Sequence, residues 1–334
     1  MQTEPHIQPS HLPHKPPILC IVGPTGAGKT HLAMALADHA KSLGQTIELI
    51  SMDSALVYRG LDIGSAKPTK AEQGAVRHHL IDILEPTESY SAARFATDAK
   101  RLCAEIRSRG NIPVVVGGTM LYWRAWAYGL SSLPPADPKI RTQLDEQGKN
   151  IGWPAMHAGL AKVDPITAAR LQPNDSQRVQ RALEVYEITG KPMSELLADS
   201  PSEDGRAGSD IPEWIDLVSL EPSDRSRLHQ NLEKRFDEML TGGLLEEVEL
   251  LKKNPALHGD LPAIRSVGYR QVWEYLSGEV DQAEMRSKAL AATRQLGKRQ
   301  LTWLRAIAGR KTFDPFNPTE LNAALEHCKQ SLNK

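Results

Sequence analysis

Short apolar runs and amphipathic stretches alternate over the first 130 residues of the chain. The apolar runs are rich in Ile, Val and Leu, as in strands buried on both faces, and lie at 18–22, 46–50 and 112–116. The amphipathic stretches carry apolar residues at every third or fourth position, as helices do, and lie at 29–43 and 91–109. This order predicts an α/β fold with a parallel sheet flanked by helices, in which ligands bind at the carboxyl ends of the strands.

The pattern changes after residue 130. Prolines at 134–138 open a stretch of helical segments, and 200–212 is a polar loop rich in Gly, Pro, Ser and Asp. The run at 215–220 predicts a return to the sheet, and an apolar residue at every fourth position from 228 to 240 predicts a helix after it. We therefore predict a disordered lead-in at 1–16, an α/β core at 17–133 and 200–312, an inserted all-helical subdomain at 134–199, and a C-terminal tail at 313–334.

The composition predicts a soluble protein. The chain has 334 residues, of which 40% are hydrophobic and 24% charged, which suits one large or two modest domains. Its three cysteines are far apart and show no metal-ligand spacing, which indicates reduced thiols in a cytoplasmic protein. No apolar run has the length of a membrane span, and residues 1–16 lack the apolar centre of a signal peptide.

Charge is balanced overall but segregated near the end of the chain. The net charge is −1, so the whole chain gives no sign of a nucleic-acid partner. Residues 286–311, however, contain eight Lys or Arg and no acidic residue, which predicts a basic helix. Such a helix is either a solvated face or an RNA-binding surface. Trp303 and the amides of Gln295 and Gln300 favour RNA, because unstacked bases bind planar and amide groups.

Residues 23–30 read GPTGAGKT, a complete G-x-x-x-x-G-K-T motif between the first predicted strand and the first predicted helix. Its three glycines let successive N–H groups converge on a phosphate, and the helix N-terminus adds its dipole. The motif is typical of nucleotide- and ATP-binding proteins, in which the Lys reaches the terminal phosphates and the Thr hydroxyl binds Mg²⁺. We predict phosphate binding by Gly23, Pro24, Thr25, Gly26, Ala27, Gly28, Lys29 and Thr30, with Thr30 as the Mg²⁺ ligand.

A hydrolytic aspartate after a second buried strand is missing from the expected places. Leu80-Ile81-Asp82 has too short an apolar lead, and the strand at 112–116 runs into Gly117-Gly118-Thr119 instead. This argues against a motor or switch NTPase. Asp53 follows a predicted strand and should lie at the same sheet edge as the phosphate loop. It is either a turn aspartate or a functional group, as a metal ligand or general base.

Seven motifs together resemble the bacterial-type tRNA dimethylallyltransferases, also called tRNA isopentenyl transferases. In order they are GPTGAGKT, SMDSALVYRGLDIGSAKPT, HHLIDILEP with ESYSAARF, VVVGGTMLY, NDSQRVQRALEVYEITG, RSVGYRQ and GKRQLTWLR. The resemblance covers about residues 18–308. It departs at Ser176, where many relatives have Pro, and the chain lacks the C-terminal zinc finger of eukaryotic relatives.

The resemblance implies transfer of the dimethylallyl group from dimethylallyl diphosphate to N6 of adenosine 37 in tRNAs that read codons beginning with U. A phosphate loop without a hydrolytic aspartate suits a diphosphate that is a leaving group. By resemblance, Asp53 is the general base and Thr119 contacts the amine or diphosphate. Arg235, with Lys29 and a Mg²⁺ ion, stabilises the leaving group. Thr119 as a turn cap and Arg235 as an ordinary exposed arginine are the alternatives.

The resemblance also implies that adenosine 37 is extruded into a channel and that the helical insertion clamps the anticodon stem. The implied tRNA-binding residues are rich in Arg, Gln and Lys, which suit phosphates and base edges. They are Asp53, Ser54, Ala55, Leu56, Thr119, Arg141, Gln177, Arg178, Val179, Gln180, Arg181, Arg265, Ser266, Val267, Gly268, Tyr269, Arg270, Lys298, Arg299, Gln300, Leu301, Thr302, Trp303, Leu304 and Arg305.

Three other functions share part of these features. An adenylate isopentenyltransferase has the loop and the aspartate, but a free nucleotide needs neither the helical insertion nor the basic helix. A P-loop nucleotide kinase would release ADP from ATP. An ATP-dependent RNA-binding protein without chemistry would not need Asp53. None of them explains all seven motifs. The resemblance further implies a monomer.

Overall fold

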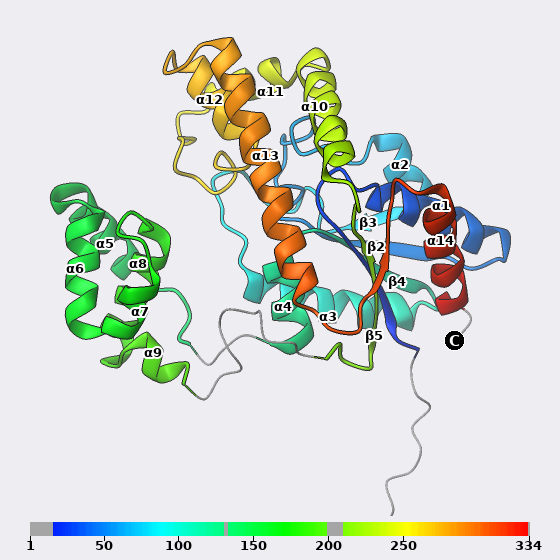
Figure 1. The fold of residues 1–334 in the computed structure, drawn as a ribbon, viewed down its shortest axis with the longest axis horizontal. Coiled ribbons are helices and arrows are strands. Elements are labelled where there is room, and N and C mark those ends of the chain that lie inside the picture. The colour runs from blue at the N-terminus through cyan, green and yellow to red at the C-terminus, as the bar shows by residue number, and fades with distance from the viewer. Residues whose placement is uncertain (1–15, 130–132, 199–209, 333–334) are drawn as a thin grey trace, which may run out of the picture. The chain divides into compact units, whose positions relative to one another are not determined.

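The computed structural model describes residues 16–129, 133–198 and 210–332 (Figure 1). The chain divides into two compact units: unit 1 comprises Met1–Tyr128 and Gly208–Lys334, and unit 2 comprises Gly129–Ala207. The lead-in predicted at 1–16, except Pro16, and most of the polar loop predicted at 200–212 lie outside the described residues. No helix in the described part of the chain is long and apolar enough to cross a membrane.

Unit 1 contains a six-stranded, all-parallel sheet with the strand order β3-β2-β4-β1-β5-β6. This confirms the predicted α/β fold with a parallel sheet. The four longer strands are the ones with apolar runs in the sequence: β1 (Ile18–Val22), β2 (Ile47–Met52), β4 (Ile112–Gly117) and β5 (Ile215–Leu220). Gly117 is in register with Val22 on one side and with Met52 on the other, so these strands end together.

The two outer strands were not predicted. They are β3 (Arg77–His79) beside β2, and β6 (Lys311–Phe313) beside β5. Each has three residues and is largely polar, so it lacks the apolar run that marks a buried strand. Pairing with a neighbour, rather than local propensity, makes these segments strands.

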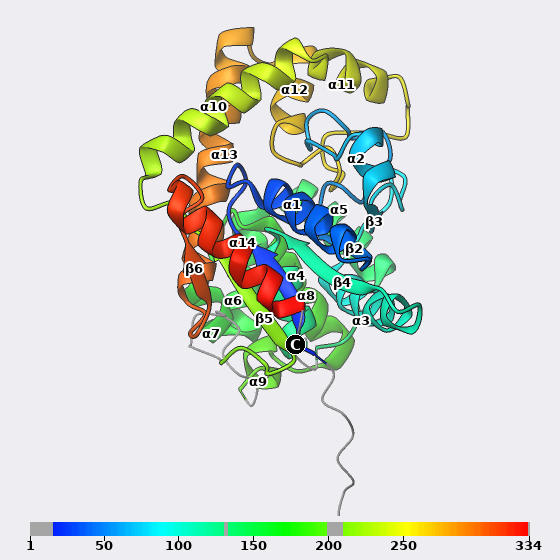
Figure 2. The ribbon, with the colours of Figure 1, turned by 90° about the vertical axis from the view of Figure 1, so that its right-hand side faces the viewer.

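Helices cover both faces of the sheet because successive strand residues alternate between two cores. Leu19 and Ile21 of β1 face the core under α1 (Lys29–Ser42) and α14 (Pro318–Leu332). Figure 2 shows these two helices side by side on that face. Cys20 and Val22 face the other core, together with residues of α3 (Ala92–Ser108) and α4 (Met120–Tyr128).

The residues described as a tail in the sequence analysis have a defined structure here. Phe313 ends β6, and most of the segment after it forms α14, in which Ala324 and Cys328 are buried against α1. Asp216 of β5 accepts hydrogen bonds from Ser331 and, at 3.0 Å, from Lys311. The end of the chain is therefore part of the sheet's helical cover, and only residues 333–334 lie outside the described residues.

The remaining helices of unit 1 group beyond the carboxyl ends of the strands (Figure 1). They are α2 (Lys70–Ala75), α10 (Arg225–Thr241), α11 (Leu244–Lys252), α12 (Tyr269–Leu276) and α13 (Gln282–Arg305). Leu228 and Leu232 of α10 pack with Leu301 of α13 in a small core. The fourfold periodicity from 228 to 240 thus marks the buried face of α10, as predicted.

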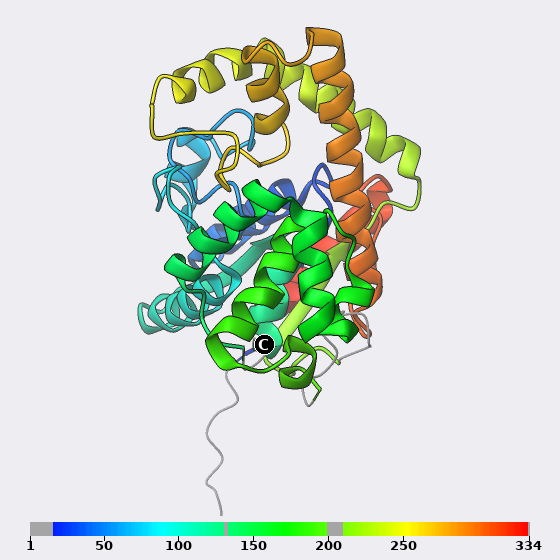
Figure 3. The same cartoon turned by 90° about the vertical axis from the view of Figure 1, so that its left-hand side faces the viewer.

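Unit 2 is all-helical, with its own core (Figure 3). Its helices are α5 (Pro138–Ile151), α6 (Trp153–Val163), α7 (Pro165–Arg170), α8 (Ser176–Thr189) and α9 (Met193–Leu196). The fully buried carboxylate of Glu184 accepts hydrogen bonds from Arg141 at 2.9 Å and Arg181 at 2.6 Å. A charge buried in this way stays ionised only because it is paired. Arg141 thereby joins α5 to α8, and Arg181 pairs with Glu184 from the same helix.

A second buried carboxylate ties the edge of the sheet together. Glu48 of β2 is only 2% exposed and accepts hydrogen bonds from Arg109 at 2.8 Å, Asn111 at 2.7 Å and His79 at 2.6 Å. Burial raises the pKa of Glu48, but these hydrogen bonds outweigh it and hold the pKa at about 2. The ionised carboxylate thereby joins β2 to β3 and to the segment that leads into β4.

We predict that Glu48→Gln lowers the free energy of unfolding at neutral pH by about 3 kcal/mol, because it removes the buried charge that accepts hydrogen bonds from Arg109, Asn111 and His79. The stabilisation exists above the ordinary pKa of 4.5 and is lost as the pH falls towards about 2, so the variant should lose less stability over that window. Urea unfolding followed by circular dichroism at several pH values measures both effects.

Glu105→Gln is the matched control, because its carboxylate is 44% exposed and pairs with Arg101 on the same helix. That pair should contribute less than about 0.5 kcal/mol. Equal destabilisation by the two substitutions would contradict the role assigned to Glu48.

Candidate functional site

The phosphate loop joins β1 to α1 and leaves the start of α1 uncapped. Gly26 and Gly28 have φ angles of +79° and +77°, a conformation that side chains rarely adopt. No side chain caps α1, and the N–H groups of Gly28, Lys29 and Thr30 have no hydrogen-bond partner among the described residues. Free donors together with the positive end of the helix dipole form a binding site for an anion.

Lys29 folds back over the loop. Its Nζ donates to the carbonyl oxygen of Pro24 at 2.8 Å, and the side chain is half-buried. Burial lowers the pKa of Lys29 to about 8; the nearby Asp53 carboxylate opposes the shift and the Arg235 guanidinium adds to it. The carbonyl is a weak substitute for a phosphate, so the ammonium group is available to an anionic ligand.

Arg235 approaches the same place from α10. Its guanidinium is half-buried and, within the described ranges, makes no hydrogen bond and no ion pair. Burial lowers the pKa of Arg235, while Asp53 and Glu238 raise it. Lys29, Arg235 and Asp53 thus lie within electrostatic range of one another, with two cations for one anion. A partly buried arginine without a partner is costly in isolation and suits a site that receives an anion.

Asp53 directly follows β2. Its Oδ1 accepts hydrogen bonds from the N–H groups of Ala55 at 2.8 Å and Leu56 at 3.3 Å, which is the turn function considered from the sequence. Its Oδ2 has no hydrogen-bond partner among the residues that the structure describes. One oxygen therefore fixes the turn, and the other has room to accept a hydrogen bond from a ligand.

Thr119 lies beside Asp53 because β4 and β2 end together. The N–H of Thr119 donates to the carbonyl oxygen of Met52 at 3.2 Å, and a Cβ on Gly117 would lie 2.1 Å from that same oxygen. Only glycine allows this close approach. The Thr119 carbonyl accepts hydrogen bonds from the first turn of α4, but its hydroxyl has no partner in the described residues, so the side chain does not cap the helix.

Two amides hold the phosphate loop in place. Asn231 of α10 donates to the carbonyl oxygen of Gly26 at 2.7 Å. Gln300 of α13 accepts from the N–H of Thr25 at 2.9 Å and donates to the carbonyl oxygen of Gly118 at 3.0 Å. Sequence reasoning missed both contacts and placed the Gln300 amide at an RNA surface. A signal existed: Gln300 follows buried Gly297 by three residues and precedes buried Leu304 by four, so it lies on the inner face of α13.

The eight basic residues predicted to form one helix at 286–311 do not all lie on α13, which ends at Arg305. Five of the eight form ion pairs: Arg286, Lys288, Arg294, Arg310 and Lys311. Lys298, Arg299 and Arg305 are exposed and have no ion pair within the described chain. The uncompensated positive charge is therefore concentrated in the last two turns of α13.

The other residues expected to contact tRNA differ in exposure. In unit 1, Arg265 is exposed and has no ion pair to a described residue, whereas exposed Arg270 pairs with Glu274 at 2.9 Å. Ser54 and Thr302 are exposed, and Ala55, Leu56, Ser266, Val267 and Trp303 are half-buried. The buried members of this group are Gly268, Tyr269, Leu301 and Leu304.

In unit 2 the predicted residues divide between surface and interior. Gln177 and Arg178 are exposed on α8, and Val179 is buried in the core. Gln180 donates to Asp145 and to the carbonyl oxygen of Arg141. Because Arg141 and Arg181 hold the buried Glu184, they stabilise unit 2 whatever else they contact.

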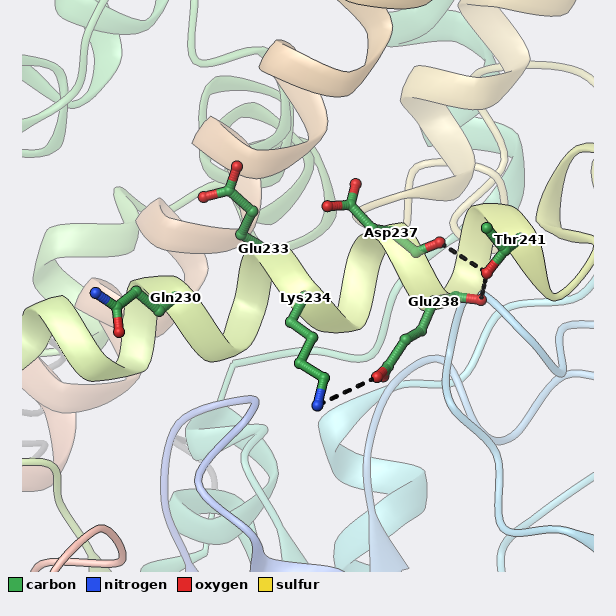
Figure 4. A pocket seen from close by; sticks show the side chains of 6 residues that line it. All are labelled: Gln230, Glu233, Lys234, Asp237, Glu238 and Thr241. Atoms are coloured by element: carbon green, nitrogen blue, oxygen red, sulfur yellow. Dashed lines mark hydrogen bonds and ion pairs between the residues drawn. The ribbon is translucent and has the colours of Figure 1, made fainter.

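A hollow on α10 is lined by Gln230, Glu233, Lys234, Asp237, Glu238 and Thr241 (Figure 4). Three of these residues are carboxylates, which repel phosphates, and their charges are already paired. Lys234 lies 3.7 Å from Glu238, and Arg286 pairs with Glu233 at 2.9 Å and Asp237 at 2.7 Å. We therefore place the candidate site at the phosphate loop and not in this hollow.

Known proteins of one kind match the chain along nearly its whole length. The family model described as IPP transferase matches residues 56–307. A protein named tRNA dimethylallyltransferase from Polynucleobacter asymbioticus is 79% identical over 332 residues, which cover 99% of this chain and 100% of that protein. A protein of the same name from Cupriavidus necator is 53% identical over 318 residues, which cover 95% of this chain and 96% of that protein.

Two solved structures share the fold. The full-length tRNA isopentenylpyrophosphate transferase of Bacillus halodurans has a TM-score of 0.63 and 34% identity, and the match covers 96% of this chain and 100% of that one. A eukaryotic dimethylallyltransferase acting on tRNA has a TM-score of 0.73 and 25% identity, and the match covers 94% of this chain and 77% of that one.

The lowered pKa of Lys29 predicts that the affinity for inorganic pyrophosphate falls as the pH rises through about 8, because the ammonium group loses its proton and its charge. Isothermal titration calorimetry with Mg²⁺ and pyrophosphate at a series of pH values measures this. Lys29→Arg stays charged throughout, so it should lack this part of the pH dependence. The same decline in Lys29→Arg would show that the ligand, and not Lys29, is titrating.

Proposed function

The chain belongs to the IPP transferase family, and from this premise we propose that it transfers the dimethylallyl group of dimethylallyl diphosphate to N6 of adenosine 37 in tRNAs reading UNN codons, with release of diphosphate. The enzyme is thus a tRNA dimethylallyltransferase. One observation supports this site. Where β1, β2 and β4 end, backbone donors, the Arg235 guanidinium and one oxygen of Asp53 come together, and none of them has a hydrogen-bond partner among the described residues.

The donor diphosphate binds at the phosphate loop in this proposal. The N–H groups of Gly28, Lys29 and Thr30 meet its oxygens, and the ammonium of Lys29 leaves the Pro24 carbonyl for them. Arg235 supplies the second positive charge. These groups are positioned before the reaction, so they stabilise the charge that develops on the leaving diphosphate without reorganisation.

A magnesium ion fits this site as a partner of the diphosphate. The exposed hydroxyl of Thr30 has no hydrogen-bond partner in the described chain, and no group of three or more His, Cys, Asp or Glu side chains there is arranged to hold a metal. Mg²⁺ therefore needs the diphosphate oxygens as ligands besides Thr30, as is common for this ion. When bound, it adds positive charge beside the leaving group.

The acceptor amine reacts between Asp53 and the diphosphate. The N6 lone pair attacks C1 of the dimethylallyl group, the C1–O bond breaks, and its electron pair leaves with the diphosphate. Oδ2 of Asp53 accepts the proton from N6, while Oδ1 keeps the Asp53 turn in place. The Thr119 hydroxyl is free to bind the amine or the diphosphate.

The tRNA binds mainly through uncompensated cations in this proposal. Lys298, Arg299 and Arg305 at the end of α13, with Arg265, contact phosphates and fix the position of the anticodon loop. Exposed residues of α8 in unit 2, Gln177 and Arg178, contact the anticodon stem. The extruded base reaches Asp53 at a cost of a few kcal/mol.

We also propose that the protein acts as a cytoplasmic monomer. The resemblance of the sequence to its family supports the monomer. The three cysteines are free and buried, which suits a reducing compartment.

We predict that Asp53→Asn reduces the turnover number about 10²- to 10⁴-fold, because an amide oxygen preserves the turn but cannot accept the proton. Mass analysis of RNase digests after incubation with Mg²⁺, dimethylallyl diphosphate and a tRNA with A37 measures the gain of one C5H8 unit. Asp38→Asn, at an exposed position of α1, is the matched control and should retain activity.

Transfer to free AMP but not to tRNA would contradict this function and favour an adenylate isopentenyltransferase. ADP release from ATP would favour a kinase. Full activity of Asp53→Asn would remove Asp53 as the base.

We predict that Lys298→Ala and Arg299→Ala each weaken tRNA binding and reduce the slope of log K against log salt by about one, because each removes one phosphate contact. The Michaelis constant for dimethylallyl diphosphate should stay unchanged. Filter binding at several salt concentrations measures the slope. Lys288→Ala is the control, because this lysine pairs with Glu284 at 2.8 Å. An equal loss in Lys288→Ala would mean that only net charge matters.

A further inference from the structure

One side chain joins the two halves of the proposed site. Gln300 of α13 uses both ends of its amide: Oε1 accepts from the N–H of Thr25 at 2.9 Å, and Nε2 donates to the carbonyl oxygen of Gly118 at 3.0 Å. Thr25 belongs to the phosphate loop, and Gly118 immediately precedes Thr119. The two strands that carry these residues, β1 and β4, are neighbours, and the loops that follow them lie close together at Gly23 and Gly118. Gln300 is the bridge between them.

The bridge leaves no free space around Gly118. A Cβ at this position would lie 2.5 Å from Nε2 of Gln300 and 2.9 Å from the carbonyl oxygen of Gly23. Real Cβ atoms do not approach other atoms so closely. The turn before Thr119 is therefore packed against both the amide and the phosphate loop, and a side chain of another length at position 300 cannot make both hydrogen bonds.

The contact with Thr25 also determines which backbone N–H groups of the phosphate loop can bind a ligand. The Thr25 N–H is occupied by Gln300, and Ala27 donates to the carbonyl oxygen of Pro24. The N–H groups at 28–30 have no partner within the described residues and remain for the diphosphate. By fixing the first half of the loop, Gln300 holds the second half in its binding conformation before the ligand arrives.

Gln300 lies within a segment whose exposed residues are cationic. Lys298 and Arg299 immediately before it are exposed, while Leu301 after it is 3% exposed and packs against Leu228 and Leu232. The same turn of α13 therefore has an outer, charged side and an inner side that contacts the phosphate loop. Gln300 belongs to the inner side.

We propose that Gln300 is a positioning residue, which sets the separation between the diphosphate donors of the phosphate loop and Thr119, and that it acts on donor binding and transfer and not on tRNA binding. This inference rests on the proposed function. The reacting atoms must be held close to their productive geometry, and small displacements reduce the rate strongly. A bidentate side chain that spans both substrate sites is suited to this task.

The test is a comparison of two variants at position 300 with the unchanged enzyme. Gln300→Leu removes both hydrogen bonds at similar volume, and Gln300→Asn keeps the amide but is one methylene too short to span both partners. For each we expect the dissociation constant of Mg²⁺–pyrophosphate and the Michaelis constant for dimethylallyl diphosphate to rise about tenfold, the factor that corresponds to one lost hydrogen bond. The turnover number should fall as well, and the dissociation constant of tRNA should stay within about twofold.

Gln282→Leu, the same substitution at the exposed first residue of α13, is the matched control and should bind pyrophosphate normally. Thermal unfolding of every variant shows whether it is folded. If Gln300→Leu does not fold, the Gln300→Asn result decides. Unchanged pyrophosphate affinity in the folded variants would overturn the proposal, as would weakened tRNA binding with normal pyrophosphate binding.

The experiment tests the role of Gln300 separately from the proposed function of the enzyme. If the unchanged enzyme transfers no dimethylallyl group but the Gln300 variants still lose pyrophosphate affinity, the function is wrong and the bridge to the phosphate loop stands. If the unchanged enzyme is active and the variants match it in donor binding, the function stands and the role of Gln300 is wrong.

Discussion

The register of three parallel strands is the constraint on which the site depends. Val22, Gly117 and Met52 lie side by side at the ends of β1, β4 and β2, and the close approach of Gly117 to the Met52 carbonyl excludes any side chain there. The phosphate loop, the Gly118-Thr119 turn and Asp53 each begin one residue later. A one-residue shift in either pairing would move every side chain to the opposite face of the sheet, so the register is fixed by both hydrophobic cores.

Within this frame the charged groups are held apart from their usual partners. Lys29 contacts only a carbonyl, and Arg235 has no hydrogen-bond or ion-pair partner among the described residues. Elsewhere the chain pairs its buried charges thoroughly, as Glu48 and Glu184 show. The contrast is informative, because a half-buried cation without an anion destabilises the free protein and is stabilised when a ligand supplies the missing charge.

Features that depend on a local sequence pattern could be predicted from the sequence. Long apolar runs predicted the four central strands, the spacing of glycines predicted the phosphate loop, and the position of Asp53 after a strand predicted its place at the same edge. Features that depend on distant partners were missed. The edge strands β3 and β6 have too few apolar residues to be recognised. The segment of α14 was described as part of a tail, because its packing against α1 depends on the folded sheet and not on its own sequence. Gln300 was expected to bind RNA from its chemistry, and its contacts with Thr25 and Gly118 were missed, although its spacing from Gly297 and Leu304 indicates the inner face of α13.

The separation of roles along α13 explains why charge counting alone was ambiguous. Five of the eight basic residues from 286 to 311 neutralise carboxylates of unit 1, among them Glu221 and Asp216 at the β5–β6 edge and Glu233 on α10. These pairs lie within α13, between α13 and α10, and at the β5–β6 edge, and they contribute little net field. The three that remain unpaired within the described chain lie within eight residues, so their field is local. In the proposed function, an RNA bound there contacts the outer side of the same turns whose inner side contacts the phosphate loop, so one helix borders both the donor and the acceptor site.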